Sequence, residues 1–258
     1  MKDNPVDNSL LQRLDSEVHV WYCLTDEEFV SSRLDVLESL ISEEELSKYR
    51  SIKHQKSQQS YLVAYAMLRS VLSGYVDRPV LDWQFVRGEH GKPALFLSDG
   101  LPDIRFNLTH TDGLTACVIS LPGDCGIDVE RHDTVHRFEA VSQRMFADEE
   151  CRFLADHDFD PAMFYRLWTL REAYVKALGL GLVGSTKDFY FQFDRDLGSA
   201  RLVHQAVAGE SERWSFRLFE PVPGYQLSVA LEAPLETSVS LSGFSFDCGL
   251  ADLVSESL

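Results

Sequence analysis

The chain has 258 residues, which is enough for one large domain or for two smaller ones that share an interface. Hydrophobic residues make up 45% of it, as in ordinary globular proteins, and this argues against extensive disorder. The net charge of −17 argues against general nucleic-acid binding, because neutralising phosphates needs a basic surface.

Signals for targeting, membrane insertion and cysteine chemistry are weak. The longest purely apolar stretch, from Tyr61 to Leu68, is too short to span a bilayer. The N-terminal residues are polar and lack the apolar core of a signal peptide. Five cysteines form no CxxC pair, so buried free thiols are expected rather than a disulfide framework or a zinc site. We therefore expect a cytoplasmic protein with no membrane partner.

The first half of the chain combines strand and helix signals. An alternating segment at 18–24 predicts an opening strand. Ser42 and Glu45 form a capping-box pattern, which predicts that a helix follows. A second helix is expected at 58–72, with Gly74 ending it. Short strands are then expected at 83–87, 104–108 and 115–120.

The second half repeats this order. A strand is expected at 126–130, helices at 136–145, 148–156 and 161–178, and strands at 189–193, 214–219 and 225–231. The longest helix is well marked, with Asp160 as N-cap, Pro161 at its first position and Gly179 past its end. The sequence thus predicts an α+β chain of two similar halves, 1–124 and 125–258, that pack tightly, although no residue-level repeat proves duplication.

Basic residues are concentrated in one acid-free segment, between Leu46 and Val76. This segment contains Lys48, Arg50, Lys53, Lys56 and Arg69. A local basic patch on an acidic protein suggests one specific anionic ligand or partner. The alternative is a solvated helix face.

The strand at 126–130 carries two carboxylates on one face. Alternate strand residues project the same way, so Asp128 and Glu130 share a face while Ile127 and Val129 face the core. Neighbouring carboxylates repel each other unless a cation lies between them, and Mg²⁺ binds one or two protein carboxylates together with substrate phosphates. The pattern therefore favours a metal site, and the alternative is a strand end with two solvated acids.

The helix at 161–178 carries a matching polar stripe. Trp168, Glu172 and Lys176 are each four residues apart and so lie on one side of the helix. Glu172 and Lys176 also have the favoured order for an ordinary helix salt bridge, which is the alternative. The glycines at 179 and 181 favour a binding site, because glycine permits close backbone approach.

Two further pieces have anion-binding character. Gly91-Lys92-Pro93 is a rigid turn that presents a lysine, and His110 lies near a strand end between two threonines. Each piece alone also has a structural explanation, because such turns are common and a histidine at a strand end is usually a hydrogen-bonded structural residue.

Taken in order, these pieces resemble the signature motifs of the surfactin-type 4'-phosphopantetheinyl transferases. The matching stretches are Gly91–Pro93, Asn107–Thr111, Gly126–Glu130 and Trp168–Lys176, followed by Gly179-Leu180-Gly181-Leu182. Each motif is weak alone, but the ordered set is highly specific. The resemblance implies the fold of that family, two similar α+β halves packed as a pseudo-dimer, with coenzyme A and Mg²⁺ in the cleft between them.

The resemblance also implies a reaction and its residues. A serine hydroxyl on an apo acyl or peptidyl carrier protein would attack the β-phosphate of coenzyme A, and 3',5'-ADP would leave. The implied metal ligands are Asp128, Glu130 and Glu172. The implied coenzyme A contacts are Lys176 and His110 at the pyrophosphate and Lys92 and Pro93 at the nucleotide end. Glu172 would also be the general base, directly or through a metal-bound water.

This chain departs from the family pattern at the start of the second helix. Relatives often have an arginine there, whereas this chain has Ser57-Gln58-Gln59-Ser60. Recognition of the coenzyme A 3'-phosphate would then fall to the acid-free segment, with Lys48, Arg50, Lys53 and Lys56 as candidates. Glu150 falls where the family has another acid near the site. The segment 134–145 falls where the family contacts its carrier, and core packing is an equal alternative.

Two other functions compete with carrier modification. The same residues could hydrolyse coenzyme A or a related pyrophosphate with water, or the chain could be a non-catalytic binding module. The module is disfavoured, because all three acids and both phosphate-facing basic residues are present. We expect a monomer, since two pseudo-equivalent halves would form the cleft within one chain.

Overall fold

The computed structural model describes most of the chain. The described residues are 8–88, 90–97, 100–121, 123–132, 138–179, 187–194, 197, 199–204, 207 and 209–247. They divide into two compact units: unit 1, within Met1–Arg87, Pro93–Leu121 and Ser238–Leu258, and unit 2, within Gly88–Lys92 and Pro122–Thr237. The glycine at 181 and the first part of the segment 134–145 lie outside the described residues.

These units differ from the continuous halves 1–124 and 125–258 that the sequence predicts. Strand β11 (Ser238–Gly243) pairs in parallel with β1 (Glu17–Thr25), so the C-terminal segment joins unit 1. The turn 88–92 joins unit 2. Both differences come from contacts between residues far apart in the sequence, which a local sequence pattern does not encode.

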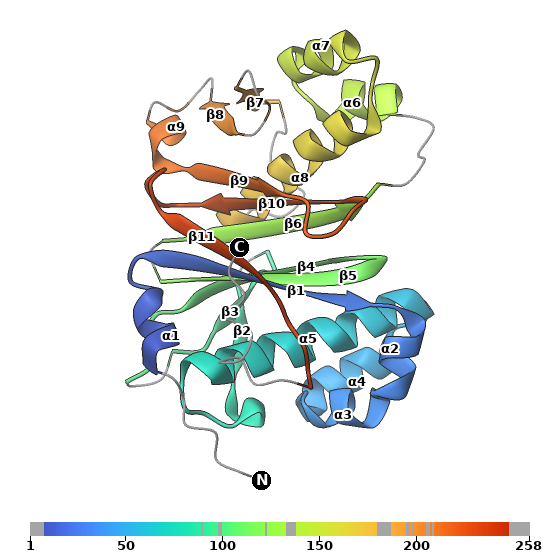
Figure 1. Cartoon of the computed structure of the whole chain (residues 1–258), viewed down its shortest axis with the longest axis vertical. Helices are drawn as coiled ribbons and strands as arrows, with labels where there is room; N and C mark the ends of the chain where they lie inside the picture. Colours follow the sequence, from blue (N-terminus) through green and yellow to red (C-terminus); the bar gives the residue numbers. More distant parts are fainter. Residues whose placement is uncertain are drawn as a thin grey trace. The chain divides into compact units, whose positions relative to one another are not determined.

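Unit 1 is built on a four-stranded sheet in the order β11-β1-β5-β4, with the long helix α5 packed against it (Figure 1). Its other elements are α1 (Asn8–Arg13), α2 (Glu27–Ser32), α3 (Leu34–Ser39), α4 (Glu43–Ser51), α5 (Gln55–Tyr75), the 3₁₀ turn η1 (Val80–Asp82), β2 (Phe85–Arg87), β3 (Pro93–Leu95), β4 (Arg105–Thr111) and β5 (Gly113–Ser120). Strands β2 and β3 form a separate antiparallel hairpin.

The helices of unit 1 show where local signals succeed and fail. Helix α4 begins after Ser42 with the expected capping box: Ser42 N–H donates to Glu45 Oε2 (2.8 Å) and Glu45 N–H donates to Ser42 Oγ (3.3 Å). The prediction that Gly74 ends the second helix is wrong, because α5 runs on to Tyr75. Tyr75 is fully buried, so its packing favours the extra helical residue.

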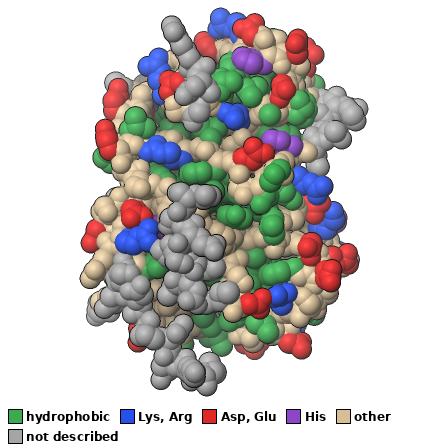
Figure 2. Space-filling model, viewed as in Figure 1, with side chains coloured by type: hydrophobic (Ala, Val, Ile, Leu, Met, Phe, Trp, Pro, Cys, Tyr) green, Lys and Arg blue, Asp and Glu red, His purple; other side chains and the backbone are tan. Residues whose placement is uncertain are grey.

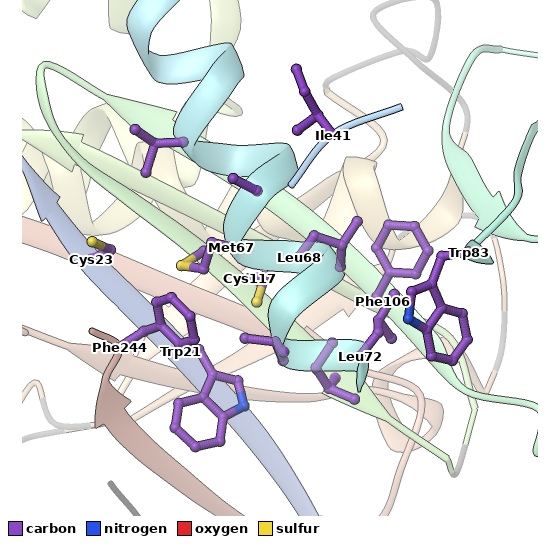
Figure 3. Close-up of a cluster of buried hydrophobic side chains, with 14 of the residues drawn as sticks. Trp21, Cys23, Ile41, Met67, Leu68, Leu72, Trp83, Phe106, Cys117 and Phe244 are labelled. Atoms are coloured by element: carbon purple, nitrogen blue, oxygen red, sulfur yellow. The ribbon is translucent and has the colours of Figure 1, made fainter. Parts of the chain in front are cut away.

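The core of unit 1 lies between α5 and its sheet (Figure 3). Met67, Leu68 and Leu72 on α5 meet Trp21 of β1 and Cys117 of β5 in this cluster. All five are at most 1% exposed. Burial of this apolar face is what fixes α5 on the sheet.

Unit 2 has a three-stranded antiparallel sheet in the order β6-β10-β9, with α8 packed along it (Figure 1). Its elements are β6 (Cys125–Arg131), α6 (Phe138–Met145), α7 (Asp148–Asp156), α8 (Pro161–Leu178), β7 (Phe189–Phe193), β8 (Ala200–His204), α9 (Glu210–Arg213), β9 (Ser215–Phe219) and β10 (Tyr225–Leu231). Strands β7 and β8 form a separate antiparallel pair.

Helix α8 has the ends that its sequence predicts. The Asp160 carboxylate accepts from Ala162 N–H (2.7 Å), and Pro161 occupies the first helical position. Gly179 ends the helix with a φ of 66°, a left-handed conformation that glycine adopts at little cost. The predicted α+β class is confirmed in both units, each of which packs one long helix on an antiparallel sheet region.

The structure also bears on the predictions about cysteines, membrane insertion and surface charge. Among the described residues, Cys23, Cys117, Cys125 and Cys151 form no disulfide; the first three are buried, as predicted, and Cys151 is half-buried. Within the described ranges, the helices are too short or too polar to cross a membrane. On the face shown in Figure 2, Lys and Arg side chains lie interspersed with Asp and Glu.

Candidate functional site

Strand β6 lies directly against α8 because of one glycine. Gly126, Asp128 and Glu130 alternate along β6, while Ile127 and Val129 between them are buried on the other face. A Cβ at Gly126 would lie only 2.0 Å from the Ala173 carbonyl oxygen of α8. The lack of a side chain therefore lets the helix backbone approach the acidic strand.

This close approach brings Asp128 and Lys176 together. Lys176 Nζ donates to Asp128 Oδ1 at 2.6 Å, and Asp128 is 5% exposed. A charge-assisted hydrogen bond at such a buried carboxylate is strong. The helix stripe that the sequence predicts thus meets the predicted acidic strand within unit 2.

Glu172 lies one helical turn before Lys176 and belongs to the same cluster. Burial raises the pKa of the Glu172 carboxyl above its ordinary value, and the negative charge of Asp128 adds to this effect. Lys176 and Arg171 oppose the rise in its pKa. A half-buried carboxyl with a raised pKa is suited to accepting a proton near neutral pH.

The donor set of this cluster fits a hard cation in its chemistry. Asp128 and Glu172 repel each other electrostatically, and half-buried Glu130 lies two residues along β6, opposite Gln226 of β10. Carboxylate oxygens are the ligands that Mg²⁺ takes. Yet no group of three or more His, Cys, Asp or Glu in the described part of the chain has the arrangement of a metal site. In this structure Lys176 supplies the positive charge at Asp128.

Lys92 has a structural role that the sequence does not reveal. Its ammonium group donates to the carbonyl oxygens of Cys125 (3.1 Å) and Ala177 (2.9 Å). It therefore ties the first residue of β6 to the last turn of α8, where a cation also interacts favourably with the helix dipole. Lys92 thus stabilises the junction of the two elements that carry Asp128 and Lys176.

The other predicted site residues lie in unit 1. His110 is exposed near the end of β4. Lys48 and Pro93 line a pocket of about 510 Å³, which residues of α4, α5, η1 and the β2–β3 hairpin enclose. Lys53 is exposed between α4 and α5 and does not line this pocket.

Comparison with known proteins identifies the family of the chain. Residues 124–230, which include the acidic strand and α8, match the family model of the 4'-phosphopantetheinyl transferase superfamily. The chain is 30% identical over 177 residues to the 4'-phosphopantetheinyl transferase HetI of Nostoc sp., covering 67% of this chain and 73% of HetI. The chain belongs to the 4'-phosphopantetheinyl transferase superfamily.

Further matches were found among the curated proteins and the solved structures. The transferase is 28% identical over 199 residues to the 4'-phosphopantetheinyl transferase Sfp of Bacillus subtilis, covering 76% of this chain and 84% of Sfp. A crystal structure of the Helicobacter pylori holo-[acyl-carrier-protein] synthase in complex with coenzyme A matches 42% of this chain and 97% of its own, with 18% identity and a TM-score of 0.31. The predicted surfactin-type family and its enzyme class, a 4'-phosphopantetheinyl transferase, are confirmed by HetI and Sfp.

Glu150 forms a buried ion pair with Arg171 in this transferase, a different role from that of another acid near the site. It is 1% exposed and accepts from Ala147 N–H (3.1 Å), from Phe191 N–H (2.9 Å) and from Arg171. Arg171 is itself buried, next to Glu172 along α8. The signal that could have indicated this pair is an acid at the third position of α7, where a capping side chain is expected.

Proposed function

We propose that this transferase moves the 4'-phosphopantetheine group from coenzyme A to a serine of an apo acyl or peptidyl carrier protein. The observation that carries the proposal is the cluster of Asp128, Glu172 and Lys176, which lies within the part of the chain that matches the family model. Phosphoryl transfer uses carboxylates to hold a divalent cation and a lysine to stabilise the charge of the phosphates.

The bond changes of the proposed reaction balance without any further reactant. The serine oxygen forms a bond to the β-phosphorus of coenzyme A, and the bond from that phosphorus to the bridging oxygen breaks. The bridging oxygen leaves on 3',5'-ADP, while the serine proton passes to Glu172, directly or through water. The raised pKa of Glu172 supports the role of proton acceptor.

Asp128, Glu130 and Glu172 would hold a Mg²⁺ ion in this proposal. When bound, the ion would neutralise charge on the pyrophosphate. Lys176 adds positive charge on the α8 side: its ammonium now contacts Asp128 at 2.6 Å and would turn to a phosphate oxygen. The mutual repulsion of Asp128 and Glu172 favours the arrival of a cation.

Unit 1 would contribute contacts to the rest of coenzyme A. In this proposal His110 binds phosphate, as the family resemblance implies, and the nucleotide end lies near Pro93 and Lys48. Lys53 would add positive charge outside the pocket. We further propose that the enzyme acts as a cytoplasmic monomer, and that the described helix 138–145 takes part in carrier docking.

A carrier mass-shift assay tests this function directly. The purified enzyme is mixed with coenzyme A, Mg²⁺ and each of a panel of apo carriers from fatty-acid, polyketide and nonribosomal peptide systems. One phosphopantetheine should be added to at least one carrier, and EDTA should prevent the addition. No mass gain on any carrier, with coenzyme A shown to bind, would contradict the proposal.

The same assay separates transfer from hydrolysis. A hydrolase would release 3',5'-ADP from coenzyme A without a carrier, so nucleotide release is followed in both reactions. Release that depends on the carrier supports transfer. Release at the same rate without carrier supports the hydrolase.

A further inference from the structure

A pair of buried hydroxyl groups joins α8 to β10. Thr169 of α8 and Ser228 of β10 are both 0% exposed, and their side-chain oxygens lie 2.7 Å apart. Thr169 Oγ1 also donates to the Tyr165 carbonyl oxygen at 2.8 Å. Because a hydroxyl group has a single hydrogen, Ser228 is then the donor to Thr169. Both hydrogens of this hydroxyl pair are used in that arrangement.

The hydroxyl pair lies beside the acidic cluster of unit 2. Ser228 is directly opposite Asp128 in the pairing of β10 with β6. Residues opposite each other on paired strands project from the same face of the sheet, with Cβ atoms about 5 Å apart. Thr169 precedes Glu172 by three residues, which is about one turn of α8. The hydroxyl pair is therefore adjacent to Asp128 on the sheet and to Glu172 on the helix.

The neighbouring part of the interface between α8 and the sheet is made of small apolar residues. Gly126 is opposite Ala230, and Ala230 packs with Ala173 and Ala177 of α8 in the core of unit 2. Apolar packing of this kind sets the separation of a helix from its neighbour but leaves its orientation variable by about 15–20°. A hydrogen bond depends strongly on angle. The bond between Thr169 and Ser228 therefore adds a directional contact to this interface.

Packing alone does not require hydroxyl groups at these two positions. Valine has nearly the shape of threonine, and alanine that of serine without its oxygen, and neither brings a polar atom that must be satisfied. Replacing both partners of a buried hydrogen bond by apolar groups of the same shape can be nearly neutral for stability. The presence of both hydroxyl groups, next to Asp128, thus points to a role in the geometry of the site.

We propose that Thr169 and Ser228 are positioning residues, whose hydrogen bond holds α8 in the orientation that keeps Glu172 and Lys176 at Asp128. This inference rests on the proposed function, in which Glu172 accepts the proton of the carrier serine. A displacement of about 1 Å in an active site can lower the rate about 100-fold. Loss of the hydrogen bond should therefore lower kcat of carrier modification more than it raises KM for coenzyme A.

Three variants separate the stability of the hydroxyl pair from its effect on the site. S228A leaves Thr169 bonded to the Tyr165 carbonyl oxygen, whereas T169V leaves the Ser228 hydrogen buried without an acceptor. T169V should therefore lower the urea midpoint of unfolding by about 1 M and S228A by about half as much. The double variant T169V/S228A has no unsatisfied hydroxyl, so its midpoint should recover to that of S228A.

The rates should follow a different pattern from the stabilities. S228A and the double variant should both lower kcat about 10- to 100-fold, although both keep most of their stability. T169S keeps the hydroxyl group and should keep kcat within about threefold of the wild type. If kcat recovers together with stability in the double variant, the two hydroxyl groups serve only the fold and the inference is overturned.

A serine on the long helix of unit 1 provides the matched control. Ser70 of α5 donates to the carbonyl oxygen of Ala66, four residues earlier, at 2.9 Å, as Thr169 does to Tyr165. Ser70 is half-buried and does not line the pocket of unit 1. S70A should leave kcat unchanged. An equal loss of kcat in S70A and S228A would remove the special role of the hydroxyl pair.

Crystal structures of S228A and of the double variant test the positioning role without any transfer assay. The contact of Lys176 Nζ with Asp128 Oδ1, now 2.6 Å, should lengthen beyond about 3.5 Å, past the range of a hydrogen bond. An unchanged contact, or a lost contact with unchanged kcat, would overturn the inference. If the contact is lost in the variants but the wild type modifies no carrier, the positioning role stands and the proposed function fails.

Discussion

The two units contain the same buried frame, built from different sequences. In unit 1, Glu45 near the start of α4 binds Arg69 of α5, whose guanidinium lies over Phe85 of β2 at 5.1 Å. In unit 2, Glu150 near the start of α7 binds Arg171 of α8, which lies over Phe189 of β7 at 4.4 Å.

The correspondence extends to the hydrogen bonds of each frame. Glu45 accepts from the N–H of Ser42 and Glu150 from the N–H of Ala147, in each case the residue before the short helix. In unit 2 only this half of the capping box exists, since alanine has no hydroxyl. The frame is thus a short helix, a long helix and the first strand of a two-stranded pair, joined by one buried ion pair.

The difference lies in what surrounds each frame. In unit 1 the frame borders a pocket, with Tyr61 and Tyr65 on its wall. In unit 2 aromatic side chains pack over the frame: Phe146 lies 5.5 Å from the Arg171 guanidinium, and Phe164 packs on Phe146. Unit 2 instead has the cluster of Asp128, Glu172 and Lys176 between α8 and β6. The same frame is therefore found beside a pocket in unit 1 and beneath packed aromatic rings in unit 2.

The largest expected effect tests the cluster of unit 2. Glu172→Gln should lower kcat/KM of carrier modification by about 10²- to 10⁴-fold, because it removes the proposed proton acceptor and one negative charge. Glu149→Gln on α7, which removes an acid that pairs with Arg152 near the surface, is the matched control and should leave the rate unchanged. Near-normal activity of the Glu172 variant, measured by carrier mass shift, would move the chemistry away from α8.

Measurements of unfolding free energy test the buried ion pair of each frame. Glu45→Gln and Glu150→Gln should each lower the free energy of unfolding by about 3–5 kcal/mol, because each leaves a buried arginine without its counter-charge. Denaturant unfolding of both variants gives the comparison.

A second substitution separates charge from packing in each frame. Adding Arg69→Met to the first variant, or Arg171→Met to the second, should recover part of the loss, because no uncompensated charge remains. A large effect in one unit and a negligible one in the other would show that the two frames are not equivalent.

Helix ends could be predicted from the sequence, whereas the buried ion pair that recurs in the two units could not. The ends of α8 and the capping box of α4 depend on residues within one helical turn, so the roles of Asp160, Gly179 and Ser42 are predictable from the sequence. The frame pairs Glu45 with Arg69 and Glu150 with Arg171, which are 24 and 21 residues apart. The acid of each pair has a local signal, its place at the third position of a short helix, but its arginine partner has none. The sequence therefore shows the repeated element order but not the repeated contact.

The candidate site likewise has parts that the sequence predicts and parts that it does not. Asp128, Glu172 and Lys176 are predicted together because strand and helix periodicity place them on single faces, and the structure brings them together. The carbonyl contacts of Lys92 are not predictable, since a turn motif does not say which backbone the lysine will meet.

A smaller effect tests the close contact of β6 with α8. Gly126→Ala places a Cβ 2.0 Å from the Ala173 oxygen, so the strand or the helix must shift. We expect a loss of about 1–3 kcal/mol in unfolding free energy, with reduced activity as Asp128 moves from Lys176. Gly88→Ala in the same unit is the control: its Cβ would lie 3.6 Å from the Lys92 oxygen, an ordinary contact. Equal effects of the two substitutions would remove the special role of Gly126.

The smallest expected effect distinguishes the units by their response to acid. His19 of β1 is buried beside the Tyr75 hydroxyl, at 2.6 Å from Nδ1, and burial lowers its pKa to about 4. The positive charge of Arg13 lowers the pKa further, while Glu17 opposes this. The pKa of His19 is lower in the folded state than in the unfolded state. Neutral His19 therefore contributes fully to the stability of unit 1 above pH 6.5, and this contribution is lost as pH falls toward 4.

Unit 2 should respond to acid in the opposite direction. Burial raises the pKa of Glu172, so this carboxyl contributes stability at low pH that is lost as pH rises through its folded pKa. Between pH 6.5 and pH 5.5, protonation of His19 should lower the unfolding free energy of unit 1 by about 1 kcal/mol. His19→Gln should make the unfolding free energy of unit 1 depend less on pH in this range. Hydrogen exchange in β1 and β5, compared with β6 and β10, resolves the two units. Equal acid sensitivity of both sheets, or an unchanged slope in the variant, would remove His19 as the cause.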